Sequence, residues 1–140
     1  YAGGDASAGT DAGEAAIFAR DTGVDAMAIS IGNVHLQQDH EGGLDETRLR
    51  AIEETTTVPL VIHGGSGVPL AQRLHLAKTS RICKFNIGTE LRMAFGAALR
   101  GAIAADPDRF DRVAILKDTH GPVMEAARAV IRGLNASGKA

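Results

Sequence analysis

A chain of 140 residues in which 44% are hydrophobic has the size and composition of one ordinary folded domain. The formal net charge of −2, with both signs scattered along the chain, excludes a basic surface for nucleic acid, and no apolar run approaches the roughly 18 residues that span a membrane. The single cysteine, Cys83, excludes a disulfide framework and a cysteine zinc cluster, and its neighbours Ile82 and Phe85 indicate a buried thiol. We therefore expect a cytoplasmic globular protein.

Residues 1–10 are mostly glycine, alanine, serine and aspartate, and we expect a loop or mobile tail there, ahead of one domain over residues 11–140. The first helix is predicted over 11–22, with Thr10 as its N-cap and Gly23 as its C-terminal stop. Further helices are predicted over 45–54 and 69–79, and from Gly121-Pro122 onward. Between these, a helix with Thr89 as its N-cap is predicted to run to a stop at Asp106-Pro107.

Three short, largely apolar runs lie between these helices, over residues 24–31, 58–62 and 81–87, and each is predicted to be a buried strand. Strands that alternate with helices pair in parallel through right-handed crossovers, which predicts an α/β fold. In such folds ligands bind at the carboxyl ends of the strands.

A polar residue follows each of the three predicted strands: His35 after the first, His63 after the second, and Asn86 at the end of the third. Because the carboxyl ends of parallel strands lie at the same edge of a sheet, we expect these side chains to gather at one site. His40 and His75 do not follow a predicted strand. We expect His40 to be a solvated loop residue, and His75 to lie at the helix surface or to fill space in the core.

The segment after the second strand reads His63-Gly64-Gly65-Ser66-Gly67-Val68-Pro69, a glycine loop followed by a proline suited to the start of a helix. Glycines let the backbone come close to a ligand, and a helix N-terminus favours an anion. Taken alone, such a loop is as often a tight turn with a satisfied histidine. Its position beside the other strand ends favours an anion site.

Strict alternation along the third strand predicts that Asn86, Lys84 and Ile82 face the site while Cys83 and Phe85 face the helices. Lys84 would then be a cation near a bound anion. The alternative is an edge lysine that keeps the strand soluble.

Three ordered motifs together resemble the class II, metal-dependent ketose-bisphosphate aldolases: Ile31-Gly32-Asn33-Val34-His35, Val61-Ile62-His63-Gly64-Gly65-Ser66-Gly67 and Lys84-Phe85-Asn86-Ile87-Gly88-Thr89-Glu90. The family folds as (β/α)8 TIM barrels about twice this length, and the resemblance is to their C-terminal half, with about the last three βα units.

The resemblance implies a lyase of carbohydrate metabolism and glycolysis. It would cleave or condense a ketose 1,6-bisphosphate, giving dihydroxyacetone phosphate and an aldehyde phosphate through a zinc-stabilised enediolate. His35 and His63 would be two zinc ligands, and Asn86 would contact the enediolate. The resemblance is also compatible with a monovalent cation bound near the phosphate. The phosphate and carbonyl end of the substrate would meet Gly64, Gly65, Ser66, Asn86, Ile87, Gly88 and Thr89, with Lys84 as a weaker candidate.

Two departures from the family pattern are visible. Leu36 stands where the family usually has glycine after the first histidine, and the catalytic aspartate and a third histidine ligand belong to the family's N-terminal half. We therefore expect this chain to be incomplete alone and to need the missing N-terminal half of the barrel, in a homo-oligomer that binds neither nucleic acid nor membrane.

Two alternatives stay open. One is a phosphate-binding half-barrel without catalysis. The other is a hydrolase that uses the glycine loop as an oxyanion hole, although Val68 breaks the G-x-S-x-G nucleophile motif around Ser66.

Overall fold

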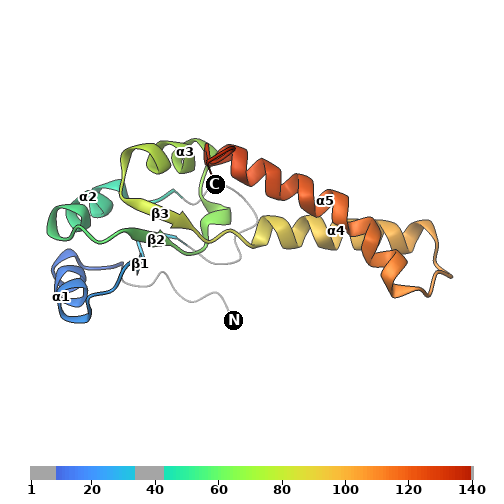
Figure 1. Ribbon diagram of the computed structural model, residues 1–140, viewed down its shortest axis with the longest axis horizontal. Coiled ribbons are helices and arrows are strands. Elements are labelled where there is room, and N and C mark those ends of the chain that lie inside the picture. Colours follow the sequence, from blue (N-terminus) through green and yellow to red (C-terminus); the bar gives the residue numbers. More distant parts are fainter. Residues whose placement is uncertain (1–8, 34–42, 140) are drawn as a thin grey trace. The chain divides into compact units, whose positions relative to one another are not determined.

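The computed structural model describes residues 9–33 and 43–139 of the chain (Figure 1). These residues form two compact units, one ending at Ile87 and the other beginning at Gly88. The first unit holds the sheet and the predicted site, and the second is a pair of helices.

The first unit alternates helices and strands, as predicted. Its elements are α1 (Ala12–Thr22), β1 (Met27–Ile29), α2 (Glu46–Thr55), β2 (Leu60–Ile62), the 3-10 turn η1 (Gly65–Gly67), α3 (Leu70–Thr79) and β3 (Ile82–Phe85). The three strands form one sheet in the order β1-β2-β3, and both pairs are parallel (Figure 1). The expected α/β fold with a parallel sheet is thus confirmed.

One face of this sheet is covered by the helices. Side chains from alternate strand positions pack against apolar residues of α1, α2 and α3 in a single core, made of Ala15, Met27, Ile29, Ile31, Leu44, Leu49, Ile52, Leu60, Ile62, Val68, Leu76 and Ile82. Leu49 and Ile52, one helical turn apart on α2, are fully buried. Burial of this apolar stripe is what holds α2 in place, since the rest of the helix is strongly polar.

Helix α1 ends as predicted but begins differently. Gly23 is its C-cap with φ 63°, a left-handed conformation that glycine adopts without strain. The N-cap is Asp11, whose carboxylate accepts the N–H of Glu14 at 3.0 Å. Thr10, the predicted cap, instead pairs with Ser30 beyond β1: its hydroxyl oxygen accepts the Ser30 N–H at 2.8 Å. The prediction for Thr10 was therefore wrong.

Strand β3 does not alternate as predicted. Leu60 pairs with Ile82 but Val61 pairs with Lys84, so Cys83 is an extra residue in a bulge. The bulge puts Ile82 in the core with Leu60, and leaves Lys84 on the face opposite the core. The predicted orientation of Ile82 and the predicted burial of Cys83 were wrong: Cys83 is exposed.

The second unit is a helical hairpin of α4 (Thr89–Ala105) and α5 (Arg112–Gly133), which pack against each other. Gly88, rather than Thr89, is the N-cap position of α4. Asp111 caps α5 by accepting the N–H groups of Val113 and Ala114. The last helix therefore begins about nine residues before the predicted start, and Pro122 lies inside it.

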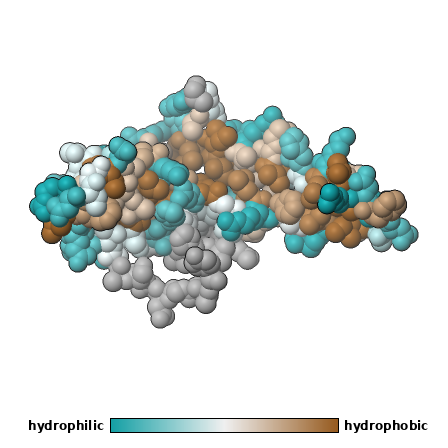
Figure 2. Space-filling model, turned by 60° about the horizontal axis from the view of Figure 1, so that its bottom comes forward, coloured by the Kyte–Doolittle hydropathy of each residue, from teal (hydrophilic) through white to brown (hydrophobic). Residues whose placement is uncertain are grey.

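The hairpin leaves many apolar side chains exposed, and Figure 2 shows apolar residues gathered on its surface. Those of the described residues are Met93, Phe95, Ile103, Phe110, Val113, Leu116, Met124 and Ile131. The two helices thus do not bury all their apolar surface against each other. Among the described residues, no helix combines the length and apolar character that crossing a bilayer requires.

Candidate functional site

His63 and Asn86 meet at the carboxyl ends of β2 and β3. The Asn86 backbone N–H donates to the carbonyl oxygen of Ile62 at 2.8 Å, which extends the parallel pairing one step past the strands. The side-chain nitrogen of Asn86 then lies 3.2 Å from each ring nitrogen of His63. Both residues follow a core-facing residue, Ile62 or Phe85, so both point to the face opposite the core. The structure brings these two predicted site residues together.

The backbone of His63 is held from the β1 side by Asn33. The Asn33 side-chain nitrogen donates to the carbonyl oxygen of His63 at 3.0 Å, and its side-chain oxygen accepts the N–H of Ile31 at 2.8 Å. Sequence reasoning gave Asn33 no role, although an amide side chain just beyond a strand end is able to bridge two backbones.

The glycine loop turns sharply after His63. Gly64 has φ 67°, which a residue with a side chain adopts only with strain. Gly65, Ser66 and Gly67 then form η1, with all three buried. Three backbone N–H groups are used nearby: Gly65 donates to Asn86 O at 3.1 Å, Gly67 to Gly64 O at 3.3 Å, and Val68 to Gly65 O at 3.3 Å. In this arrangement those three N–H groups are not directed at a ligand.

Gly65 lies too close to the end of β3 to carry a larger side chain. A Cβ atom added at Gly65 would be 3.2 Å from Ile87 Cγ1 and 3.4 Å from both Asn86 O and Phe85 Cβ. The loop after β2 and the segment after β3 therefore pack directly on each other. Ile87, a predicted site residue, is part of this contact.

A buried arginine lies behind the glycine loop. Arg73 on α3 is only 1% exposed, and its Nε donates to the carbonyl oxygen of Val68 at 2.9 Å. Val68 closes η1, so this hydrogen bond ties the loop to the helix that follows it. The sequence offered no signal for it, because Arg73 sits in a helix whose polar residues suggest a solvated face.

The remaining predicted residues are distributed as follows. Lys84 is exposed on the same sheet face as Val61, its register partner. Gly88 and Thr89 begin the second unit, at the start of α4. His35, Leu36 and His40 lie outside the described residues. The side chain of His75 is 54% exposed, with its Nε2 3.8 Å from Glu46 Oε2, as expected for a surface histidine.

No group of three or more histidine, cysteine, aspartate or glutamate residues that could hold a metal occurs within 9–33 and 43–139. His63 is an exposed imidazole at a strand end, and a neutral imidazole nitrogen is a good zinc ligand. The described residues thus fit one ligand of a zinc site but do not make such a site by themselves.

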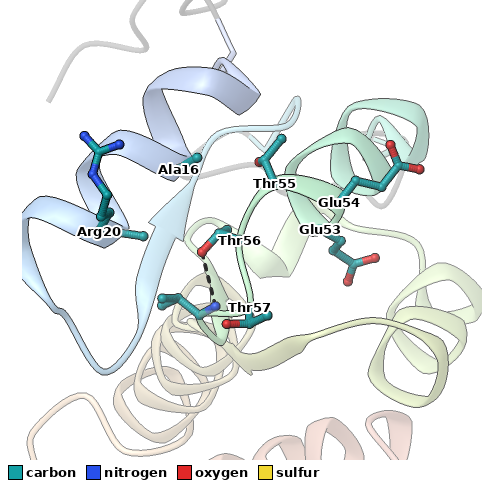
Figure 3. Close-up of a pocket in the computed structure, with 9 residues that line it drawn as sticks. Ala16, Arg20, Glu53, Glu54, Thr55, Thr56 and Thr57 are labelled. Atoms are coloured by element: carbon teal, nitrogen blue, oxygen red, sulfur yellow. Dashed lines mark hydrogen bonds between the residues drawn. The ribbon is translucent and has the colours of Figure 1, made fainter.

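A shallow groove of about 350 Å³ opens at the other end of the sheet. The C-terminal parts of α1 and α2 and the residues leading into β2 line it, including Arg20, Glu53 and Thr56 (Figure 3). A dashed line in Figure 3 marks the bond from Val58 N to Thr56 Oγ1, 3.3 Å long. Since the groove lies at the amino ends of the strands, it is separate from the site at His63.

The model of one protein family, class II fructose-bisphosphate aldolase, matches residues 2–139. The chain belongs to this family. The aldolase motifs quoted above thus lie in a chain that is related to these enzymes over almost its whole length.

Curated and solved relatives agree with the assignment to the aldolase family. The chain is 33% identical over 132 residues to the 6-phospho-5-dehydro-2-deoxy-D-gluconate aldolase of Bacillus licheniformis, covering 93% of this chain and 44% of that protein. It is 31% identical to the YdjI aldolase of Escherichia coli K12, with a TM-score of 0.70, covering 94% of this chain and 46% of that one. The fructose-bisphosphate aldolase of Campylobacter jejuni, 20% identical, shares the fold with a TM-score of 0.70 over 91% of this chain and 46% of its own. The chain therefore spans about half the length of the relatives it matches.

Proposed function

We propose that the complete protein containing this chain is a metal-dependent aldolase, which breaks a carbon–carbon bond of a phosphorylated ketose to release dihydroxyacetone phosphate. The observation that carries the proposal is the contact between His63 and Asn86 at adjacent strand ends, in a chain of the aldolase family. A carboxylate that moves the proton is expected from the other half of such a barrel.

His63 and His35 would hold a zinc ion, together with a ligand from elsewhere in the complete protein. When bound, the metal would polarise the ketose oxygen and stabilise negative charge that develops there. Asn86 carries a side-chain amide with two N–H donors, one of which would be able to donate to the same substrate oxygen.

Phosphate would bind beside η1, remote from the reacting carbons, and so supply orientation. Gly64, Gly65, Ser66, Asn86 and Ile87 are our candidates on the first unit. The N–H of Gly65 is bonded to Asn86 O, so Gly65 would not donate to the phosphate. Its contribution would be the close packing of the loop against the segment after β3. Gly88 and Thr89 on the second unit remain candidates from the resemblance alone. Lys84 would add a positive charge on the sheet face opposite the core.

Two substrate classes are supported by different observations. The family resemblance favours a ketose 1,6-bisphosphate such as fructose or tagatose bisphosphate. The relative at 33% identity is named for a 2-deoxy keto-sugar acid with one phosphate, which favours that class as the second candidate. Both classes share the phosphorylated ketone end, so the residues described here would treat them alike. Direct comparison of cleavage rates on both substrates separates them.

The experiment that tests the proposal combines metal removal with histidine replacement in the complete protein. Treatment with a strong chelator should abolish release of dihydroxyacetone phosphate, and zinc should restore it. His63→Ala should abolish both activity and tight zinc binding, whereas His75→Ala should change neither. Full turnover by demonstrably metal-free protein would overturn the proposal, and so would equal losses in the two histidine variants. A protein that binds phosphate ligands without any cleavage would favour the non-catalytic alternative.

A further inference from the structure

On the β1 side, the regular hydrogen bonding of the sheet stops just before His63. The ladder between β1 and β2 ends with the pair Ile29–Ile62, one residue before His63. One residue after His63, Gly64 turns the chain with φ 67°. A side chain at such a junction has a well-defined direction only if other groups hold the backbone.

Asn33 holds this junction with both ends of its amide. Its nitrogen donates to the carbonyl oxygen of His63 at 3.0 Å, and its oxygen accepts from Ile31 N at 2.8 Å. The amide therefore joins the two backbones by hydrogen bonds just beyond the last residue pair of β1 and β2. On the other side, Asn86 bonds to Ile62 O through its backbone and contacts the His63 ring through its side chain.

We propose that Asn33 is a positioning residue for His63: it fixes the His63 backbone so that the imidazole is oriented for metal binding, without itself contacting metal or substrate. The inference rests on the proposed function, in which His63 is a zinc ligand. Groups that orient a ligating histidine typically contribute about 10- to 100-fold to metal affinity. Asn33 differs from the usual case in acting on the backbone of the ligand rather than on its second ring nitrogen.

Two variants of Asn33 and one matched control test this role in the complete protein. Asn33→Leu has nearly the same shape and removes both hydrogen bonds. Asn33→Ser keeps a short hydroxyl that can accept from Ile31 N but is too short to span to His63 O. The control is Thr10→Val, which removes an acceptor from Ser30 N, next to Ile31, without contacting His63.

The readouts are zinc affinity, measured by competition with a chromophoric chelator, the visible absorption spectrum of the Co²⁺-substituted protein, and the midpoint of thermal unfolding. We expect both Asn33 variants to bind zinc at least about 10-fold more weakly and to show an altered Co²⁺ spectrum. Because each substitution removes a backbone hydrogen bond, the Asn33 variants and Thr10→Val should all lower the unfolding midpoint. Thr10→Val should nevertheless leave the zinc affinity and the Co²⁺ spectrum unchanged. Asn33→Ser keeps the test valid if Asn33→Leu does not fold.

The inference is overturned if the Asn33 variants keep wild-type zinc affinity and Co²⁺ spectrum, or if Thr10→Val changes them equally. In either case loss of zinc binding in His63→Ala would show that the proposed function still stands. Unchanged zinc binding in His63→Ala would instead remove the proposed function, and the positioning role with it. The two failures are therefore distinguishable from the same set of variants.

Discussion

The backbone N–H of Gly65 donates to the carbonyl oxygen of Asn86 at 3.1 Å, joining the loop after β2 to the segment after β3. Two motifs that are more than twenty residues apart in the sequence thus form one packed unit. A change at the contact between the two segments should therefore disturb the loop beside η1, where we propose that phosphate binds.

Gly65→Ala tests this coupling. The added Cβ would be 3.2 Å from Ile87 Cγ1 and 3.4 Å from Asn86 O, so the segment after β3 has to move by a few tenths of an ångström. Overpacking of this kind costs roughly 1–3 kcal/mol, and we expect a lower midpoint of thermal unfolding. We also expect weaker binding of dihydroxyacetone phosphate by calorimetry, with zinc content preserved.

The matched control is Gly101→Ala on α4, where an added Cβ meets no described atom within 4 Å. Alanine is favoured over glycine in a helix by up to about 1 kcal/mol, so this variant should be as stable as wild type or more so. Equal effects of the two glycine substitutions on stability and ligand binding would contradict the close packing at Gly65.

Arg73→Met tests the support behind the glycine loop. The substitution removes the donor to Val68 O at 2.9 Å while keeping most of the buried stem. An unmade hydrogen bond at a buried group costs about 1–3 kcal/mol, so the free energy of unfolding should fall by at least that amount. Arg73→Lys should not rescue it, because an ammonium at the end of a longer stem cannot replace Nε. Chemical denaturation measures the free energy of unfolding of both variants.

Lys78→Met, on the exposed side of the same helix, is the control for Arg73. It removes one positive charge from α3 without removing a buried donor, and surface substitutions usually change stability by less than about 0.5 kcal/mol. If Lys78→Met and Arg73→Met destabilise equally, the effect belongs to the charge of the helix and not to the bond with Val68.

The order and type of the elements in the first unit could be predicted from the sequence because the signals there are local. Apolar runs of strand length predict the strands, and Gly23, in the left-handed conformation, ends α1. Each signal lies within the element that it predicts. Parallel pairing followed from the alternation of strands and helices. The meeting of His63 and Asn86 followed from that pairing.

The errors came from features that depend on tertiary context. Nothing local distinguishes Thr10 from Asp11 as a cap, and the choice is made by the bond between Thr10 and Ser30, across twenty residues. The bulge at Cys83 reverses the expected alternation for Ile82, since register is set by the neighbouring strand. The roles of Asn33 and Arg73 likewise depend on backbone groups of other segments.

Lys84→Gln tests whether the lysine on β3 contributes to anion binding. Lys84 is exposed on the face opposite the core, in register with Val61. A hydrogen bond to a charged group is worth roughly 1.5–3 kcal/mol, so loss of a phosphate contact should raise KM by about tenfold or more with a smaller change in kcat. Steady-state kinetics of the complete protein give both constants. Lys78→Gln is the control and should leave KM unchanged. Unaltered KM in Lys84→Gln would assign the lysine to strand solubility.

Pro122→Ala tests where the last helix begins. In the structure Pro122 lies inside α5, ten residues after Arg112, where a proline lacks the N–H that would bond to the preceding turn. A proline in a helix interior costs up to about 3 kcal/mol relative to alanine, so Pro122→Ala should raise the midpoint of thermal unfolding. If the helix instead began at Gly121-Pro122, proline would suit its first turn and alanine would bring no gain.

Gly121→Ala separates the same alternatives, because alanine is favoured in a helix interior and disfavoured at an N-cap. Pro107→Ala, in the turn between the two helices, is the control and should be neutral or slightly destabilising. A lower midpoint in both Pro122→Ala and Gly121→Ala would contradict a continuous helix from Arg112 to Gly133.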